Sequence, residues 1–154
     1  MLTGVGFMHS KNIAHRDLKL DNILLIENKT KEEVPFIIKI IDFGFSVTTE
    51  KPSKQFCGTP SYMAPEIVKK IEYDPKATDI WALGILAYRM LYGVPPFRAP
   101  TEKDLYSKIT KGSYYFPSEE KNDPEKPLPT NVSAEAKDII SKMLQYKQID
   151  RASA

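Results

Sequence analysis

Residues 77–92 constrain the fold of this chain more than any other segment, because they form its most apolar stretch. A helix that is hydrophobic around most of its circumference lies inside a core. Gly93 and then Pro95 and Pro96 follow the segment, and such residues are typical of the end of a helix. The sequence therefore predicts a helix over residues 77–92 that is buried on most of its sides.

Three more helices follow from sequence patterns. Residues 2–9 place their apolar side chains roughly on one helical face. Thr101 with Asp104 resembles a capping box, with Asp in place of the usual Glu or Gln, and opens a helix to about residue 111. Ser133 is a typical N-cap for a helix with an apolar stripe at i, i+3, i+4, i+7 and i+8. The stripe consists of Ala136, Ile139, Ile140, Met143 and Leu144.

The strands are expected near the N-terminus. Residues 23–26 and 36–41 are apolar runs, and residues 27–35 between them form a polar, charged loop. Residues 48–58 have no period and predict an exposed, mobile loop, and residues 118–130, rich in proline and charge, predict another loop. The predicted fold class is therefore mainly α with a short β-hairpin pair, in one domain.

Composition and charge exclude several classes of function. The 154 residues, 42% hydrophobic and 27% charged, are ordinary for a globular domain with a real core. A net charge of +2 is too small to indicate nucleic acid or a membrane as the main partner. The single cysteine, Cys57, excludes an internal disulfide, and no stretch resembles a membrane span or a signal peptide. We therefore expect a cytoplasmic location, with the nucleus as an alternative.

The string HRDLKLDN, followed by the strand pair and then by DFG, carries candidate chemistry. Transfer of a γ-phosphoryl group to a hydroxyl requires positioning, charge neutralisation and a proton acceptor. Asp17 can accept the hydroxyl proton, and Lys19 can neutralise the γ-phosphate. Asn22 and Asp42 offer the hard oxygen ligands that Mg²⁺ prefers, and the hairpin between them can hold them close together.

Each of these pieces alone has a plainer interpretation. A His-Arg-Asp run is usually a surface charge cluster, an Asn before a strand is usually a turn residue, and Asp-Phe-Gly is more often a turn than a metal site. Their joint occurrence, in this order and across a predicted hairpin, favours the catalytic interpretation.

Together with APE at residues 64–66, these motifs resemble the catalytic loop, the metal-binding motif and the end of the activation segment of eukaryotic protein kinases. The resemblance extends over essentially the whole chain and implies ATP and Mg²⁺ as cofactors. The resemblance implies that Asp17 is the catalytic base and that Lys19 contacts the phosphate. It further implies that Asn22 and Asp42 are the Mg²⁺ ligands and that Leu24 lies beneath the adenine ring.

The same resemblance implies structural roles. His15 and Phe43 would belong to a hydrophobic column that links two lobes, with Asp79 as its anchor. Glu66 and Arg151 would form a buried ion pair. The implied fold is that of a protein-kinase-like C-terminal lobe (α+β), with the N-terminal lobe absent.

Two residues favour a serine/threonine kinase over a tyrosine kinase. Lys19 stands where the Ser/Thr branch has lysine, and Thr59 can hydrogen-bond both Asp17 and Lys19. Thr59 would thereby connect the substrate platform, which includes Ser61 and Tyr62, to the catalytic loop. The expected partners are protein substrates with Ser/Thr acceptors. The strings DFGFS and CGTPSYMAPE look most like the calmodulin-dependent and AMP-activated-kinase-like group.

Two positions depart from the family pattern. Many relatives have a phosphorylatable Thr where this chain has Gln55, and we expect Gln55 to make a neutral hydrogen bond to Arg16, so that activation does not depend on phosphorylation there. The alternative is that Ser53, or a threonine before it, is the phosphosite. Arg89 stands where one branch of relatives, which prefers basic substrates, has a Glu that pairs with a substrate arginine. This difference predicts a weaker preference for arginine in the substrate, although Asp21 still offers an acidic contact. A solvated helix residue is the alternative for Arg89.

Several parts of the family pattern do not occur in this sequence, among them a Gly-rich phosphate loop and a Val-Ala-Ile-Lys-like strand. We therefore expect residues 1–154 to be a partial kinase domain, from the middle of the helix before the catalytic loop to just before the last helix. Without the other lobe, we expect an exposed apolar patch around Leu24 and Phe43 and negligible activity of the isolated chain. The alternative is a binding or regulatory module, against which the intact catalytic set argues.

Overall fold

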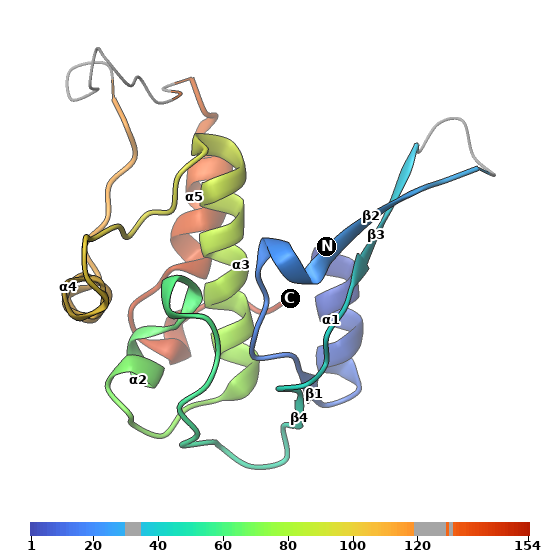
Figure 1. Ribbon diagram of the computed structural model, residues 1–154, viewed down its shortest axis with the longest axis horizontal. Coiled ribbons are helices and arrows are strands. Elements are labelled where there is room, and N and C mark those ends of the chain that lie inside the picture. Colours follow the sequence, from blue (N-terminus) through green and yellow to red (C-terminus); the bar gives the residue numbers. More distant parts are fainter. Residues whose placement is uncertain (30–34, 119–128, 130) are drawn as a thin grey trace.

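A long helix, α3 (Pro75–Tyr92), runs through the middle of the computed structural model, as Figure 1 shows. The structure describes residues 1–29, 35–118, 129 and 131–154. The helix begins two residues earlier than the sequence predicts, because the Asp74 side chain accepts a hydrogen bond from Lys76 N at 2.9 Å and caps it. Gly93 ends the helix in the left-handed conformation, with φ 72°. Most of its side chains are buried, so the prediction of a central buried helix is confirmed.

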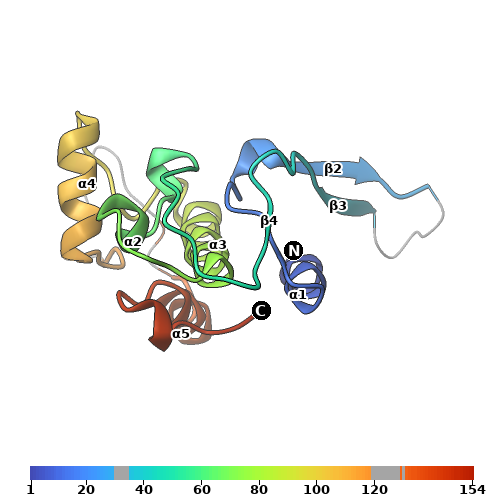
Figure 2. The ribbon, with the colours of Figure 1, turned by 90° about the horizontal axis from the view of Figure 1, so that it is seen from below.

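Other helices surround α3. The second long helix, α5 (Ala134–Met143), lies against it in both Figure 1 and Figure 2, and α4 (Glu102–Lys111) lies on the side away from the hairpin. Helix α1 (Leu2–Ser10) lies beneath the hairpin, and the short α2 (Pro65–Val68) contacts α4. The core contains Trp81, which stacks on Phe97 with ring centroids 5.7 Å apart.

Both predicted N-caps are present. Thr101 Oγ1 accepts a hydrogen bond from Asp104 N at 3.2 Å, and Ser133 Oγ accepts one from Ala136 N at 3.2 Å. The Asp104 carboxylate accepts a further hydrogen bond from the Thr101 hydroxyl. In the predicted stripe of α5, the three core members are buried, whereas Ile139 is 41% exposed and lies at its edge. The buried members are Ile140, Met143 and Leu144.

The predicted hairpin forms from β2 (Ile23–Glu27) and β3 (Phe36–Ile40), paired antiparallel with Ile23 opposite Ile40. A second pair, β1 (Ile13–Ala14) with β4 (Val47–Thr48), was not predicted. Two-residue strands carry no alternation that a sequence pattern can show, and their pairing depends on tertiary contacts.

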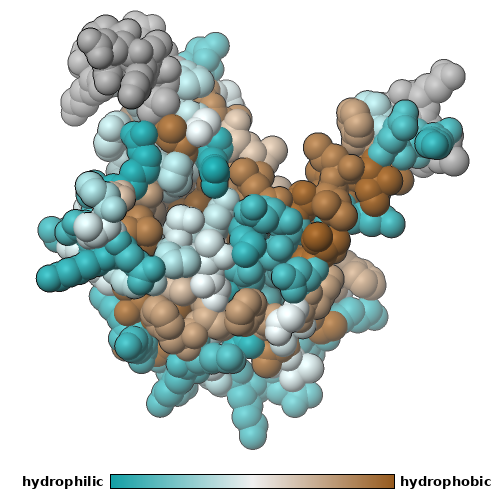
Figure 3. Space-filling view, in the orientation of Figure 1, coloured by the Kyte–Doolittle hydropathy of each residue, from teal (hydrophilic) through white to brown (hydrophobic). Residues whose placement is uncertain are grey.

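The hairpin is apolar on both faces and leaves much of that surface exposed. Figure 3 shows it as a brown arm that projects from the body of the molecule. Leu24 is 44% exposed and Phe43 is 47% exposed, so the predicted exposure of apolar surface there is confirmed. We call this surface the hairpin patch, and its exposed members are Leu24, Leu25, Ile26, Phe36, Ile37, Ile38 and Phe43. A groove of about 460 Å³ separates β3 from α1.

Residues 48–58 are mostly exposed, as predicted, but they are more regular than a loop. Thr48 belongs to β4, and Ser53 exchanges two backbone hydrogen bonds with Tyr73, at 2.8 and 2.9 Å. Cys57 at the end of the segment is buried. Large parts of the other two predicted loops, 27–35 and 118–130, lie outside the described residues. Among the described helices, none is long and apolar enough to cross a bilayer.

Gly84 sets the distance between α3 and α5. A Cβ at this position would lie 2.7 Å from Leu144 Cδ2 and 2.9 Å from Met143 Cβ. We expect Gly84→Ala to destabilise the protein by about 1–3 kcal/mol through overpacking. The matched control is Gly4→Ala in α1, where the nearest atom lies at 3.5 Å. That change should stabilise by about 0.5–1 kcal/mol, because alanine is the better helix former. Equal effects of both variants in urea denaturation would contradict tight packing at Gly84.

Candidate active site

The segment that carries HRDLKLDN is held against α3 by one carboxylate. Asp79, fully buried on α3, accepts hydrogen bonds from His15 N at 2.8 Å and from Arg16 N at 2.7 Å. His9 Nε2 from α1 contacts the same carboxylate at 2.9 Å. Arg16 has φ 66°, in the left-handed region that side chains avoid and that is common at functional sites. The loop therefore has a defined shape, fixed from the protein core.

Four predicted site residues meet in one cluster. Thr59 Oγ1 donates a hydrogen bond to Asp17 Oδ1 at 2.7 Å and accepts one from Lys19 Nζ at 3.1 Å. Lys19 Nζ also lies 3.0 Å from Asp17 Oδ2. Asn22 Nδ2 donates to the Asp17 carbonyl oxygen at 2.9 Å and lies 3.3 Å from Asp17 Oδ2. The two hydrogen bonds expected of Thr59 are thus both present, although residues 17 and 59 are far apart in the sequence.

The electrostatics of the cluster keep Lys19 charged. The pKa of its ammonium group is raised, chiefly by the hydrogen bond to Asp17 and further by the charges of Asp17, Asp21 and Asp42, against the opposing effect of burial. A raised lysine pKa adds stability below the unfolded-state value, and this contribution is lost only as the pH rises through the higher folded-state value. Lys19 therefore carries its charge throughout the neutral range.

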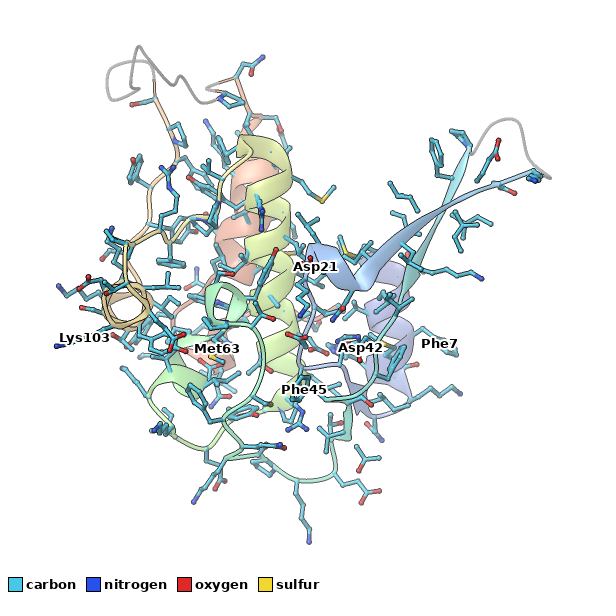
Figure 4. The ribbon with its side chains drawn as sticks, viewed as in Figure 1. Phe7, Asp21, Asp42, Phe45, Met63 and Lys103 are labelled. Carbon is cyan, nitrogen blue, oxygen red and sulfur yellow. The ribbon has the colours of Figure 1, made fainter. Side chains whose placement is uncertain are left out.

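Asp42 is exposed and lies at the base of the hairpin, two residues past the end of β3. Ile41 N donates a hydrogen bond to Asn22 O at 2.9 Å, which continues the β2–β3 pairing and brings the DFG segment beside the HRDLKLDN segment. Asp42 has φ 61°, and its Oδ1 accepts a hydrogen bond from Gly44 N at 3.1 Å. Figure 4 shows Asp42 and Asp21 on this side of the molecule, which agrees with the influence of both charges on Lys19.

The chemistry of the donor set suits Mg²⁺ better than a softer metal. Asn22 and Asp42 supply one amide and one carboxylate oxygen, and Mg²⁺ in phosphoryl-transfer sites takes few protein ligands, together with phosphates and waters. In the described part of the chain, no group of three or more His, Cys, Asp or Glu residues gathers as a metal site. The predicted ligands therefore fit a metal that a nucleotide brings with it.

His15 and Phe43 touch, as the predicted column requires. Their ring centroids lie 5.1 Å apart in an edge-on arrangement, and His15 Nε2 lies 2.9 Å from Ile41 O. Leu24, the residue expected beneath an adenine ring, lies on β2 in the hairpin patch.

Arg16 connects the HRDLKLDN segment to the segment after DFG. Its Nε donates to Phe45 O at 2.6 Å, and its NH1 donates to Gln55 Oε1 at 2.9 Å. A longer contact of 3.5 Å joins NH1 to Ser53 Oγ. The hydrogen bond expected between Arg16 and the neutral amide of Gln55 is present. It holds residues 45–55 to the HRDLKLDN segment without a phosphate. Tyr73 adds a tie that the sequence did not suggest, because its hydroxyl donates to Gln55 O at 2.8 Å.

The platform residues Thr59, Ser61 and Tyr62 lie in and just before the short 3₁₀ helix η2 (Pro60–Tyr62). Gly58, which sequence reasoning did not single out, makes their approach possible. It has φ 104°, and a Cβ there would lie 2.9 Å from Arg16 O. Its place inside the CGTP string was the only available signal.

Glu66 and Arg151 form the expected ion pair in the core. Arg151 NH1 lies 2.5 Å from Glu66 Oε1, and NH2 lies 2.7 Å from Oε2. The remaining donors of Arg151 reach backbone carbonyls, including Gln145 O at 2.8 Å and Ala77 O at 3.1 Å. Its guanidinium also lies over the Trp81 ring, 5.0 Å from the centroid. The pair therefore joins the end of the chain to α2 and α3.

Comparison with known proteins gives the following matches. A model of the protein kinase domain matches residues 1–154. Calcium-dependent protein kinase 4 of Plasmodium falciparum (isolate 3D7) is 43% identical over 156 residues, which cover 100% of this chain and 27% of that protein. Serine/threonine-protein kinase Aurora-1 of Arabidopsis thaliana is 41% identical over 145 residues, 94% of this chain and 43% of that protein. Aurora kinase of Eremothecium gossypii is 39% identical over 153 residues, 98% of this chain and 36% of that protein.

The chain spans less than half the length of each of these relatives. Calcium-dependent and Aurora kinases match it at similar identity, so the expected likeness to the calmodulin-dependent group stays a prediction.

The Glu66–Arg151 pair yields a test of stability. We expect Glu66→Ala to cost about 3–5 kcal/mol, because it leaves a buried guanidinium without its carboxylate. The matched control is Glu72→Ala, which removes an exposed carboxylate 3.4 Å from Lys54. The control should cost about 0–1 kcal/mol. Urea denaturation of the full-length protein measures both values, and a small loss for Glu66→Ala would contradict the buried pair.

Proposed function

The chain belongs to the protein kinase family, and from that premise we propose that it is the C-terminal, catalytic part of a protein serine/threonine kinase. Its reaction is the transfer of the γ-phosphoryl group of ATP to Ser or Thr hydroxyls of protein substrates. The observation that carries the proposal is the cluster of Asp17, Lys19, Asn22 and Thr59, assembled from two distant segments within hydrogen-bonding distance.

Each member of the cluster has a distinct part in the proposed chemistry. The buried Asp17 carboxylate accepts the proton of the substrate hydroxyl as the hydroxyl attacks. Lys19, kept protonated by its surroundings, offsets charge on the transferred group. Asn22 and Asp42 would hold the Mg²⁺ that accompanies ATP and neutralises its phosphates.

Specificity for Ser and Thr is proposed from the position of Thr59. Its hydroxyl ties the platform directly to both Asp17 and Lys19. Because Ser61 and Tyr62 follow in the same turn, the platform presents a peptide close to the catalytic base. A substrate with a short hydroxyl side chain fits this close approach.

We also propose that a further lobe, contributed by the rest of the protein, covers the hairpin patch. An exposed apolar surface of this kind is typical of an interaction site. Leu24, 44% exposed, would then lie beneath the adenine ring of ATP. The isolated chain is expected to be inactive, because its site is open to water, where charges act weakly.

Activation is proposed to be independent of phosphorylation at residue 55. The neutral amide of Gln55 accepts a hydrogen bond from Arg16 NH1 at 2.9 Å, and Arg16 Nε also donates one to Phe45 O. These two hydrogen bonds hold residues 45–55 to Arg16 without the charge of a phosphate. Ser53 is the alternative phosphosite, since its hydroxyl already lies 3.5 Å from Arg16 NH1.

Asp17→Asn in the full-length protein tests the reaction. Asparagine keeps the size of the side chain but cannot accept the proton, so we expect kcat to fall about 10²- to 10⁴-fold, the usual scale for a general base. The control is Asp150→Asn, an exposed residue of the 3₁₀ helix η4 (Gln148–Asp150), which should leave kcat unchanged. Transfer of ³²P from ATP to a serine peptide gives the rate. Full activity of the Asp17 variant would refute the proposal.

Phosphatase treatment tests the activation mechanism. We expect the treated protein to keep its activity, because the Arg16–Gln55 hydrogen bond does not need phosphate. Gln55→Ala should lower the activity, and Ser53→Ala should not. Mass spectrometry accompanies each assay, and loss of activity together with a phosphate from Ser53 would favour the alternative phosphosite.

A further inference from the structure

Arg89 is an exposed cation in the last turn of α3 that contacts the substrate platform. Its NH1 donates a hydrogen bond to the Tyr62 hydroxyl at 3.1 Å. Tyr62 is only 6% exposed, so the arginine is attached to a rigid residue. Figure 2 shows the segment around η2 lying against α3, which agrees with this contact.

The charge of Arg89 is not neutralised by the rest of the described chain. Across residues 1–29, 35–118, 129 and 131–154, none of the ion pairs involves it. A guanidinium has five N–H donors, and the contact with Tyr62 uses one of them. Arg89 is exposed, and within the described residues its side chain makes no hydrogen bond other than the one to Tyr62.

The position of Arg89 relative to the proposed reaction follows from two contacts. Tyr62 N donates a hydrogen bond to Thr59 O at 2.9 Å, and Thr59 binds Asp17. The guanidinium is therefore separated from Thr59, which binds the proposed catalytic base, by the Tyr62 side chain and the two hydrogen bonds at its ends. This separation is on the order of 10 Å, the span of about two to four residues of extended peptide.

We propose that Arg89 selects an anionic side chain in the protein substrate, two to four residues from the hydroxyl that is phosphorylated. The inference rests on the proposed kinase function and adds a substrate class to it. A carboxylate or a phosphate is the ligand that a guanidinium binds with paired, charge-assisted hydrogen bonds. Asp, Glu and a previously phosphorylated residue share this chemistry.

The opposite preference would come from Asp21. This residue lies in the 3₁₀ helix η1 (Leu20–Asn22), and no ion pair joins it to Arg89. Its carboxylate would attract an arginine of the substrate. The fixed attachment of Arg89 to the platform, through the hydroxyl of Tyr62, favours selection by the cation.

A positional peptide series with the full-length protein tests the proposal. Each peptide carries one serine acceptor, and each of the four positions on either side is Ala, Asp, phosphoserine or Arg in turn. We expect kcat/KM for Asp to exceed that for Ala about fivefold at one position two to four residues away, the scale of an exposed ion pair. Phosphoserine should exceed Asp there, because it carries more charge. The higher kcat/KM of the Asp and phosphoserine peptides should come from a lower KM.

Variants assign the preference to a residue. In Arg89→Ala the ratio of Asp to Ala peptides should fall to about one, and in Arg89→Glu it should invert in favour of Arg. The ratio is measured within each variant, so it does not depend on the fraction of protein that folds. The matched control is Arg98→Ala, an exposed arginine with no contact to Tyr62 in the described chain, which should keep the wild-type ratio.

Three results would overturn the inference. They are a wild-type preference for Arg, no preference at any position, or an equal loss of the ratio in the Arg89→Ala and Arg98→Ala variants. In each of these cases the peptides are still phosphorylated, so the proposed function survives. If the wild-type protein phosphorylates none of the peptides, both proposals fail.

Discussion

The structure depends on a buried carboxylate, that of Asp79, which binds the backbone of the HRDLKLDN segment. A buried charge is costly unless it is hydrogen-bonded. Here His15 N and Arg16 N supply donors at 2.8 and 2.7 Å, and His9 adds a contact at 2.9 Å. Asp79 is fully buried on α3, and its hydrogen bond to Arg16 N holds the left-handed turn at Arg16 against that helix. The position of Asp17 follows from that of the two residues before it.

The candidate site then gathers around this fixed loop from three directions. The hairpin brings Asp42 beside Asn22, the platform brings Thr59 to Asp17, and Arg16 binds the segment between them. Each of these three connections is a hydrogen bond of 2.7–2.9 Å. The cluster of Asp17, Lys19, Asn22 and Thr59 therefore forms from contacts within the described chain, while the hairpin patch is exposed.

Much of this was predictable from the sequence, and the exceptions have physical causes. The buried helix, its glycine end, both serine/threonine caps and the hairpin follow from periodicity and capping chemistry, which act over neighbouring residues. The pairing of β1 with β4 and the strand-like contact of Ser53 with Tyr73 join distant segments, and no local pattern encodes them. Likewise, the left-handed φ angle of Arg16 is imposed by tertiary contacts against the residue's own preference.

The central claim is that Asn22 and Asp42 hold a metal-bound nucleotide beside Asp17. A crystal structure of the full-length protein with Mg²⁺ and a non-hydrolysable ATP analogue tests this most directly. The account predicts a metal ion at about 2.0–2.1 Å from an oxygen of each of the two side chains, with the γ-phosphate facing Lys19. A nucleotide bound elsewhere, or a metal ion that touches neither residue, would contradict it.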